Sequence, residues 1–506
     1  MSGVALRERV LNAVDACAEE LVDFTTALIK VPTVNPPGDA YPECAELIGR
    51  QLQHCGFAVT YFPAEGRPEH TAAHPRVNVV GRRAGTRARP TIHLNGHFDV
   101  VPAGDGWTLD PFGGVVRDGR IYGRGSCDMK AGIAAAVYAA EAIRRAGVTL
   151  NGAVEVSGTV DEESGGFAGV AWLAAQGHLT ARSVDHVIIP EPLNVDRVCL
   201  GHRGVYWFEV ATHGRIAHGS MPFLGVSAID QMTQVLERIR QDLLPQLASR
   251  TTAVPVVPDL ARHATLNING IVGGQPVDGI QTPCVADLCR AVFDRRFLVE
   301  EGFDATRREI VQLLDRLAAD VPGFRYDLRD LMVVHPTHTP PDSPLVAALD
   351  RHIHDVLGRP ATHVASPGTY DHKHVDRIGG IHHCVAYGPG ILDLAHQPVT
   401  KLVLLQFQIV MGLQIEPKLT GNTQTTTEAQ GGISRDGSLA TNNLVDPAGW
   451  NTHGLGQPVL AEPQRPEKFL HQDFARMNRL DFFRGHRLTP NGNQPVRPRP
   501  VRHEAT

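Results

Sequence analysis

Short apolar segments of strand length alternate with helical stretches up to residue 190, and this alternation constrains the fold more than any other feature. Residues 77–80, 91–94, 154–160 and 187–189 are rich in β-branched side chains, which favour strands. Residues 5–30 carry apolar side chains at helical spacing, and residues 131–146 predict a second helix that Gly147 ends. Strands that alternate with helices predict an α/β fold with buried strands.

The middle of the chain has a different order of expected elements. The expected strands are residues 205–211, 266–272, 285–293 and 324–328, and the expected helices are residues 228–244 and 305–318. The order strand, helix, strand, strand, helix, strand matches a ferredoxin-like α+β unit. We therefore predict that residues 204–338 form an inserted domain, and that residues 1–203 and 339–400 are two parts of one α/β domain.

Residues 401–506 have an unusual composition. One apolar stretch, residues 402–415, is followed by a segment rich in Gly, Asn, Gln, Thr and Pro and then by one rich in Arg and Pro. Periodicity is weak here, which predicts a largely disordered extension.

Charge and cysteine usage exclude several classes of protein. The formal net charge of -6 gives no basic footprint, which argues against nucleic acid as a partner. The chain has no apolar run long enough for a membrane span and no signal-peptide pattern at its start. Its 8 cysteines form no C-x-x-C pair, which indicates reduced thiols and a cytoplasmic protein.

Polar motifs follow several of the apolar segments. His97 and Asp99 come after residues 91–94 and face the same side of an extended chain, so Asp99 is placed to orient the His97 imidazole. Asp128 follows a glycine-rich loop just before the helix 131–146, where a carboxylate can cap the helix or bridge two cations. Taken alone, the His97–Asp99 pair is common by chance, and a carboxylate such as Asp128 before a helix is more often a cap than a ligand.

Three adjacent carboxylates, Asp161, Glu162 and Glu163, follow residues 154–160. A solvated turn is one explanation, because water can share the load of like charges. A metal site is the other, with one carboxylate as ligand and its neighbour as general base. Glu191 and His396 also follow apolar segments, and the carboxyl ends of strands are where sites gather in open α/β sheets.

Five of these residues together make a coherent donor set. His97, Asp128, Glu163, Glu191 and His396 supply two imidazoles and three carboxylates. This set suits zinc or a similar ion, and five ligands with one bridging carboxylate suit two ions.

The segment HLNGHFDVVPAGDGWTLDPFGGVVRDGRIYGRGSCDMK, residues 93–130, resembles the zinc-dependent exopeptidase and deacylase family. Members include acetylornithine deacetylase, succinyl-diaminopimelate desuccinylase, aminoacylase, glutamate-releasing (carboxypeptidase G-like) enzymes and dipeptidases. The resemblance continues through residues 161–163, 190–192, 217–220 and 395–398 in the family's order. It implies a zinc-exopeptidase-like catalytic domain with an inserted ferredoxin-like domain that serves as lid and dimer interface.

The resemblance also implies a role for each matching residue. His97 and Glu191 are the expected terminal ligands of one zinc, Glu163 and His396 those of the other, and Asp128 is the expected bridge. Glu162 is the expected general base, and Asp99 the residue that orients His97. His218, on the inserted domain, is expected to stabilise the oxyanion, and in family dimers it reaches the partner's site.

Expectations about substrate contacts are less constrained. Arg296 lies on an expected strand of the inserted domain, where relatives often bind a substrate carboxylate, although an exposed strand charge explains it equally well. Asn267 lies on the neighbouring strand, and Gly368 belongs to a loop that resembles a substrate-lining loop.

Two departures from the family pattern bear on function. Asp278 stands where many relatives have Asn. After His396, Gln397 and Pro398, the expected closing helix with acidic residues is replaced by Val399 and a divergent tail. A true extension and a shifted reading frame both explain that tail, and an uninterrupted gene would exclude the second.

The resulting expectation is a metal-dependent hydrolase of linear amide bonds with two divalent ions, zinc or alternatively cobalt or manganese. N-acyl amino acids or N-acyl diamino acids are the first expected substrates, and the run from Trp107 to Phe112 resembles that of deacylases and peptidases. A dipeptidase or carboxypeptidase is one alternative, and a non-catalytic binding relative is another. A homodimer with no nucleic-acid or membrane partner is expected.

Overall fold

The computed structural model describes residues 3–274, 283–392, 395–397 and 401–403. All described residues lie within Met1–Thr425. Asp278 and most of the expected extension over residues 401–506 fall outside the described residues. No helix in the described ranges is long and apolar enough to cross a membrane.

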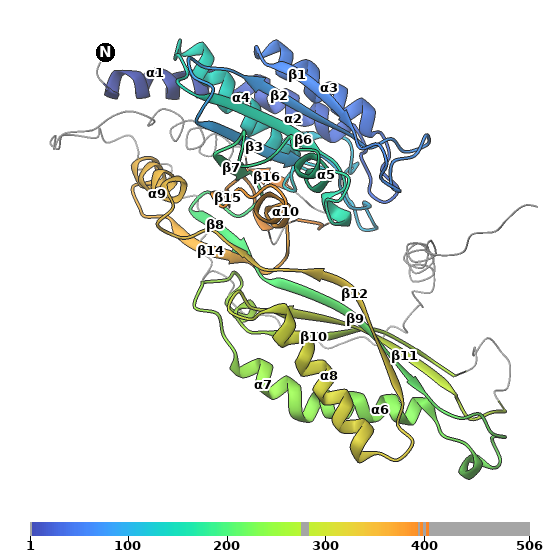
Figure 1. Ribbon diagram of the computed structural model, residues 1–506. Helices are drawn as coiled ribbons and strands as arrows, with labels where there is room; N and C mark the ends of the chain where they lie inside the picture. Colours follow the sequence, from blue (N-terminus) through green and yellow to red (C-terminus); the bar gives the residue numbers. More distant parts are fainter. Residues whose placement is uncertain (1–2, 275–282, 393–394, 398–400, 404–506) are drawn as a thin grey trace, which may run out of the picture. The chain divides into compact units, whose positions relative to one another are not determined.

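A mixed nine-stranded sheet dominates the described part of the α/β region (Figure 1). Its order is β1-β2-β6-β3-β7-β15-β8-β13, with β14 paired to β8. The strands are β1 (Ala58–Pro63), β2 (Val77–Arg83), β3 (Thr91–His97), β6 (Ala153–Thr159), β7 (His186–Ile189), β8 (Arg197–His202), β13 (Thr337–His338), β14 (Thr362–Ser366) and β15 (Cys384–Ala386).

The centre of this sheet is parallel and fully buried. β3 pairs in parallel with β6 on one side and with β7 on the other. Every residue of β3 and β6 is buried, as the apolar segments predicted. Parallel pairing brings the carboxyl ends of these strands to one edge of the sheet, and the candidate site lies there.

Helices pack on this sheet and on one another. They are α1 (Gly3–Ala16), α2 (Ala18–Lys30), α3 (Tyr41–His54), α4 (Lys130–Arg145), α5 (Val170–Ala175), α9 (Pro344–Leu357) and α10 (His372–Arg377). The helical spacing over residues 5–30 is confirmed, and buried Cys17 divides the region into α1 and α2. Both helices pack on α4, whose alanine-rich surface allows close approach. Gly147 has a positive φ of 65° and follows α4, which confirms the expected end.

A separate antiparallel sheet of four strands in the order β10-β11-β9-β12 follows β8 along the chain. Its strands are β9 (Gly204–His213), β10 (Thr265–Gly273), β11 (Leu288–Phe297) and β12 (Tyr326–Val334), and its helices are α6 (Ala228–Arg238), α7 (Leu244–Ser249) and α8 (Phe303–Asp320). Figure 1 shows α6 and α8 on one face of this sheet. The order of elements is the one that the sequence predicted, and we propose residues 204–338 as an inserted domain.

Two local differences from the expectation concern helix and strand ends. A π-helical turn, Ile239–Leu243, divides the expected helix over residues 228–244 into α6 and α7. Lys401–Val403 forms β16, which pairs with β5 (Arg120–Tyr122) of the hairpin that β4 (Val115–Arg117) begins. The start of the expected disordered extension is therefore a strand.

Candidate metal centre

The five predicted ligands come from chain segments that follow strands or precede a helix. His97 is the last residue of β3, and Asp128 precedes α4 by two residues. Glu163 lies in a 3₁₀ turn after β6, Glu191 follows β7, and His396 follows β15. The structure brings all five together at one edge of the large sheet.

Two groups of three residues share Asp128. In the first, which we call the buried group, one ligand atom each of His97, Asp128 and Glu191 lies within 4.8 Å of the others. His97 Nε2 is 3.2 Å from Asp128 Oδ1 and 3.8 Å from Glu191 Oε1. The side chains of His97 and Glu191 are only 1% and 10% exposed, so this group is shielded from water.

The second group, which we call the loop group, contains Asp128, Glu163 and His396 and meets the same 4.8 Å criterion. His396 Nε2 is 3.2 Å from Glu163 Oε1 and 3.3 Å from Asp128 Oδ2. The His396 side chain is 50% exposed, in contrast to that of His97. Asp128 thus directs one carboxylate oxygen to each group.

The electrostatics of the two groups suit cations. Burial raises the pKa of Glu191 well above its ordinary value, and burial also raises the pKa of Glu163. Carboxyl groups that resist ionisation in a buried site ionise readily when a cation is bound beside them. Imidazole and carboxylate donors at these separations fit one divalent ion in each group, bridged by Asp128.

Asp99 connects the end of β3 to the turn that carries Glu162 and Glu163. His97 Nδ1 is 3.0 Å from the Asp99 carbonyl oxygen and 3.3 Å from its carboxylate. The Asp99 carboxylate accepts hydrogen bonds of 3.1 Å from the backbone N–H groups of both Glu162 and Glu163. Asp99 is therefore placed to orient the imidazole and to fix the turn, a second contact that the sequence did not indicate.

The repulsion expected among Asp161, Glu162 and Glu163 is relieved by two cations from distant parts of the chain. Arg76 Nε donates to Asp161 at 3.0 Å, and both side chains are nearly fully buried. Lys373 Nζ lies 3.3 Å from Glu162 Oε1, with side-chain exposures of 6% and 11%. Sequence reasoning missed Arg76 and Lys373, because neither belongs to a recognisable motif.

The predicted substrate contacts have other partners. Arg296 donates to Asp294 of its own strand at 2.8 Å, and Asn267 donates to Asn269 at 2.8 Å. His218 is exposed and contacts Ser220 at 2.8 Å, while Gly368 N–H donates to Ser366 at 3.2 Å. Within the described ranges, no contact joins these residues to the buried or loop group, so their roles stay predictions.

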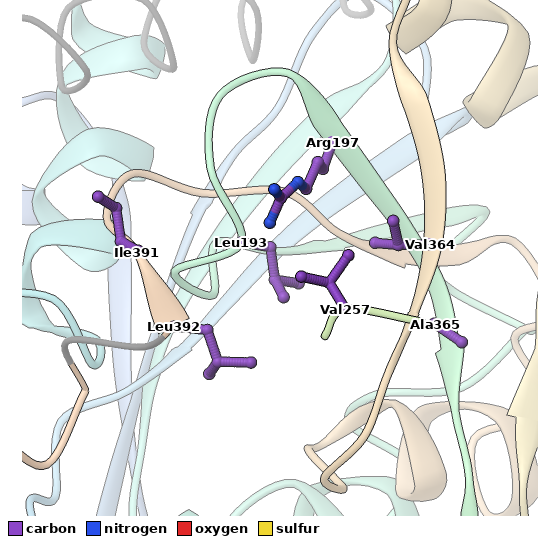
Figure 2. A pocket seen from close by; sticks show the side chains of 7 residues that line it. All are labelled: Leu193, Arg197, Val257, Val364, Ala365, Ile391 and Leu392. Atoms are coloured by element: carbon purple, nitrogen blue, oxygen red, sulfur yellow. The ribbon is translucent and has the colours of Figure 1, made fainter. Parts of the chain in front are cut away.

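A small pocket lies next to the Glu191 segment but does not include the ligands. It is lined by Leu193, Arg197, Val257, Val364, Ala365, Ile391 and Leu392. Figure 2 shows that Arg197 supplies its charged group among otherwise apolar side chains. No member of either three-residue group lines this pocket.

Known proteins are similar to this chain over the segments that contain the five predicted ligands. The family model described as Peptidase family M20/M25/M40 matches residues 93–411. Succinyl-diaminopimelate desuccinylase of Psychrobacter arcticus is 27% identical over 367 residues, which cover 71% of this chain and 85% of that protein.

Two solved structures share the fold at low sequence identity. The dipeptidase Dug1p from Saccharomyces cerevisiae has a TM-score of 0.64 at 17% identity and covers 81% of this chain and 98% of its own. A dinuclear metal-binding peptidase from Bacillus subtilis has a TM-score of 0.58 at 17% identity and covers 80% of this chain and 98% of its own.

Proposed function

This chain belongs to peptidase family M20/M25/M40, and from that premise we propose that it is a two-metal hydrolase of linear amide bonds. The observation that carries the proposal is the pair of three-residue groups that share Asp128. Glu162 lies directly beside Glu163 of the loop group, and its carboxylate has a fixed partner in Lys373. The B. subtilis peptidase, described as binding two metals, supports the ion count.

The roles of the side chains follow from their positions. Two divalent ions would act as Lewis acids toward the scissile carbonyl and would lower the pKa of a water molecule at the site. His97 and Glu191 would hold one ion, Glu163 and His396 the other, and Asp128 both. Glu162 would take a proton from the attacking water and pass it to the leaving nitrogen. Zinc, cobalt and manganese all suit this donor set.

Deacylation of N-acyl amino acids or N-acyl diamino acids is our first choice of reaction. It is supported by the relative from P. arcticus, named as a desuccinylase, over most of that protein's length. A dipeptidase is the second candidate, because the yeast structure with the same fold is described as a dipeptidase. A non-catalytic relative is disfavoured, because all five predicted ligands and Glu162 are present in the chain and the ligands fall into two groups that could hold a metal.

The test is hydrolysis of N-succinyl, N-acetyl and N-formyl amino acids and of dipeptides by metal-loaded protein, beside Glu162→Ala. We expect metal-dependent release of amine from one substrate class, and a fall of about 10²–10⁴-fold in the variant. Equal release by Glu162→Ala would remove Glu162 from the mechanism. No release from any substrate by protein that binds two ions per chain would favour the non-catalytic alternative.

We also propose a homodimer that forms through the inserted domain. β10 is the edge strand of its sheet, and an unpaired edge is ready to accept another strand. Ile271 and Val272 on β10 are 52% and 77% exposed, and Ile229 of α6, which lies next to Gly273 at the end of β10, is 43% exposed. Sedimentation across a concentration series should show a dimer, and Val272→Lys should weaken it. Monomer at every concentration would contradict the proposal.

A further inference from the structure

Arg124 is buried between the segment that contains Ala103 and the segment that contains His396. It contacts His396, the most exposed predicted ligand of the loop group. The Arg124 side chain is nearly fully buried, although it carries a permanent charge. Its Nη2 donates to the carbonyl oxygens of Ala103 at 3.0 Å, His396 at 3.2 Å and Pro102 at 3.4 Å. One nitrogen therefore connects Ala103 to His396, which is about three hundred positions further along the chain.

The position of the guanidinium is fixed from several directions. Its carbon lies 5.3 Å from the ring centroid of Trp107, a distance suited to a cation–π contact. The Trp107 Nε1 group donates at 2.9 Å to the same Ala103 carbonyl that Arg124 contacts. The Arg124 backbone N–H donates to Pro111 at 2.7 Å. The guanidinium therefore has little freedom to leave the site.

The flanking glycines add to this rigidity. Gly125 has a φ of 82°, and a Cβ at that position would lie 2.8 Å from the Val100 side chain. Gly123 has a φ of 155°, and a Cβ there would lie 2.5 Å from the Ile29 side chain. Only glycine fits both places without a shift of the surroundings, so the loop presents Arg124 in one orientation.

His396 has a conformation that needs support. Its φ is 63°, in the left-handed region that a side chain disfavours, and its own side chain is half exposed. A ligand on an exposed segment in this conformation is held in place only if its backbone is anchored. The Arg124 hydrogen bond to the His396 carbonyl is such an anchor, and it leaves the imidazole free to contact Asp128 and Glu163.

The charge of Arg124 also attracts the carboxylates of the loop group. Arg124 interacts electrostatically with both Glu163 and Asp128, the two carboxylates of the loop group. Two of its nitrogens, Nε and Nη1, are buried and have no hydrogen-bond partner among the described residues. The guanidinium is therefore held in place by its carbonyl contacts and by Trp107.

We propose that Arg124 is a positioning residue for the loop-group metal: it anchors the backbone of His396 and thereby sets the affinity of that ion without contacting it. This inference rests on the proposed two-metal function. It assigns a separate structural support to one of the two ions, because no contact described above joins Arg124 to His97 or Glu191. The buried group should therefore keep its ion when Arg124 is replaced.

The test is calorimetric titration of metal-free protein with Zn²⁺ for wild type, Arg124→Met, Arg124→Lys and His396→Ala. We expect two bound ions per wild-type chain. Arg124→Met should bind the first ion like wild type and the second about 10–100-fold more weakly, which is typical for loss of a residue that orients a ligand. Arg124→Lys should lie between them, since an ammonium cannot reproduce the planar contacts. Adding Arg124→Met to His396→Ala should change binding no further.

Arg117→Met is the matched control. Arg117 stacks on Tyr122 at 5.5 Å in the neighbouring hairpin and is 57% exposed, so its loss should leave both affinities unchanged. Two tight ions in Arg124→Met, or equal weakening of both ions, would overturn the inference. Fewer than two ions in wild type would instead contradict the proposed function. Circular dichroism of each variant, with Arg124→Lys as the milder change, separates misfolding from loss of metal.

Discussion

The buried group and the loop group share Asp128 but are supported in different ways. His97 is the last residue of β3 and Glu191 follows β7 by two residues, and their side chains are at most 10% exposed. His396 lies on a segment beyond the sheet and is 50% exposed. The buried group is thus fixed by the same hydrogen bonds that hold the sheet together, whereas the loop group depends on side chains that reach across to it.

This difference implies different affinities for the two proposed ions. A ligand at the end of a buried strand cannot move without disturbing the core. A half-exposed ligand can leave its position through local opening that costs far less than global unfolding. The loop group is therefore the part of the site where small changes elsewhere in the chain should affect metal binding first.

Asp128→Ala should have the largest effect, because it removes the one residue that both groups use. We expect loss of both tightly bound ions, and a fall in activity of roughly 10³-fold or more, since Lewis-acid polarisation contributes several kcal/mol. Metal analysis after dialysis and steady-state kinetics would check this. Retention of one tight ion by the variant would show that the two groups are independent sites and would break the comparison.

His97→Ala and His396→Ala should separate the groups most clearly. Removal of the buried His97 takes the imidazole partner away from the carboxyl groups of Asp128 and Glu191, so we expect metal-free His97→Ala to lose on the order of 2 kcal/mol of unfolding free energy. His396→Ala removes a half-exposed contact and should lose less than about 1 kcal/mol. Urea unfolding without metal measures both, and equal losses would contradict the assigned difference in support.

Much of the buried group could be predicted from the sequence. Apolar segments rich in β-branched residues marked β3, β6 and β7, and a polar residue directly after each one pointed to a shared edge. The mixed character of the sheet could not be predicted, because an apolar pattern carries no information about strand direction. The break at Cys17 and the π-helical turn Ile239–Leu243 were missed for a similar reason, since both preserve apolar spacing.

The supports of the site were harder to predict than its ligands. Arg76, Lys373 and Arg124 are ordinary basic residues in the sequence, and each becomes significant only through a partner far along the chain. Long basic side chains can reach several neighbours, so spacing does not identify their contacts. Arg296, Asn267 and His218 lie on the proposed inserted domain and have partners within it, so spacing alone did not identify their contacts.

Lys373→Met should lower the catalytic rate moderately. The substitution alters a residue next to the loop group but removes no predicted ligand. Lys373 holds one oxygen of Glu162, and loss of a hydrogen bond between charged groups costs about 1.5–3 kcal/mol at most, so we expect kcat to fall roughly tenfold. KM and the number of bound ions should not change, and Lys373→Arg should restore most of the rate. A loss of metal in Lys373→Met would show that it supports Glu163 rather than Glu162.

The smallest effect concerns the protons that metal binding displaces. Hydrogen bonds from His396 to Asp128 and Glu163 raise the pKa of His396 to about 10 in the metal-free protein. This raised pKa stabilises the folded metal-free protein fully below the ordinary histidine value, and the contribution is lost as the pH rises through about 10. At pH 8 the imidazole is still protonated and must lose its proton to bind a cation.

Calorimetry of Zn²⁺ binding at pH 8, in two buffers of different ionisation enthalpy, gives the number of protons released. Wild type should release about one proton more than His396→Gln, because only wild type has the protonated imidazole in the loop group. Because protons compete with the ion for this imidazole, the affinity of the second ion should rise about tenfold for each unit by which the pH increases toward 10. Equal proton release would show that His396 is already neutral in the metal-free site. The loop group would then need to lose no proton from His396 before it binds an ion. The half-exposed position of His396 would then not weaken metal binding in this group.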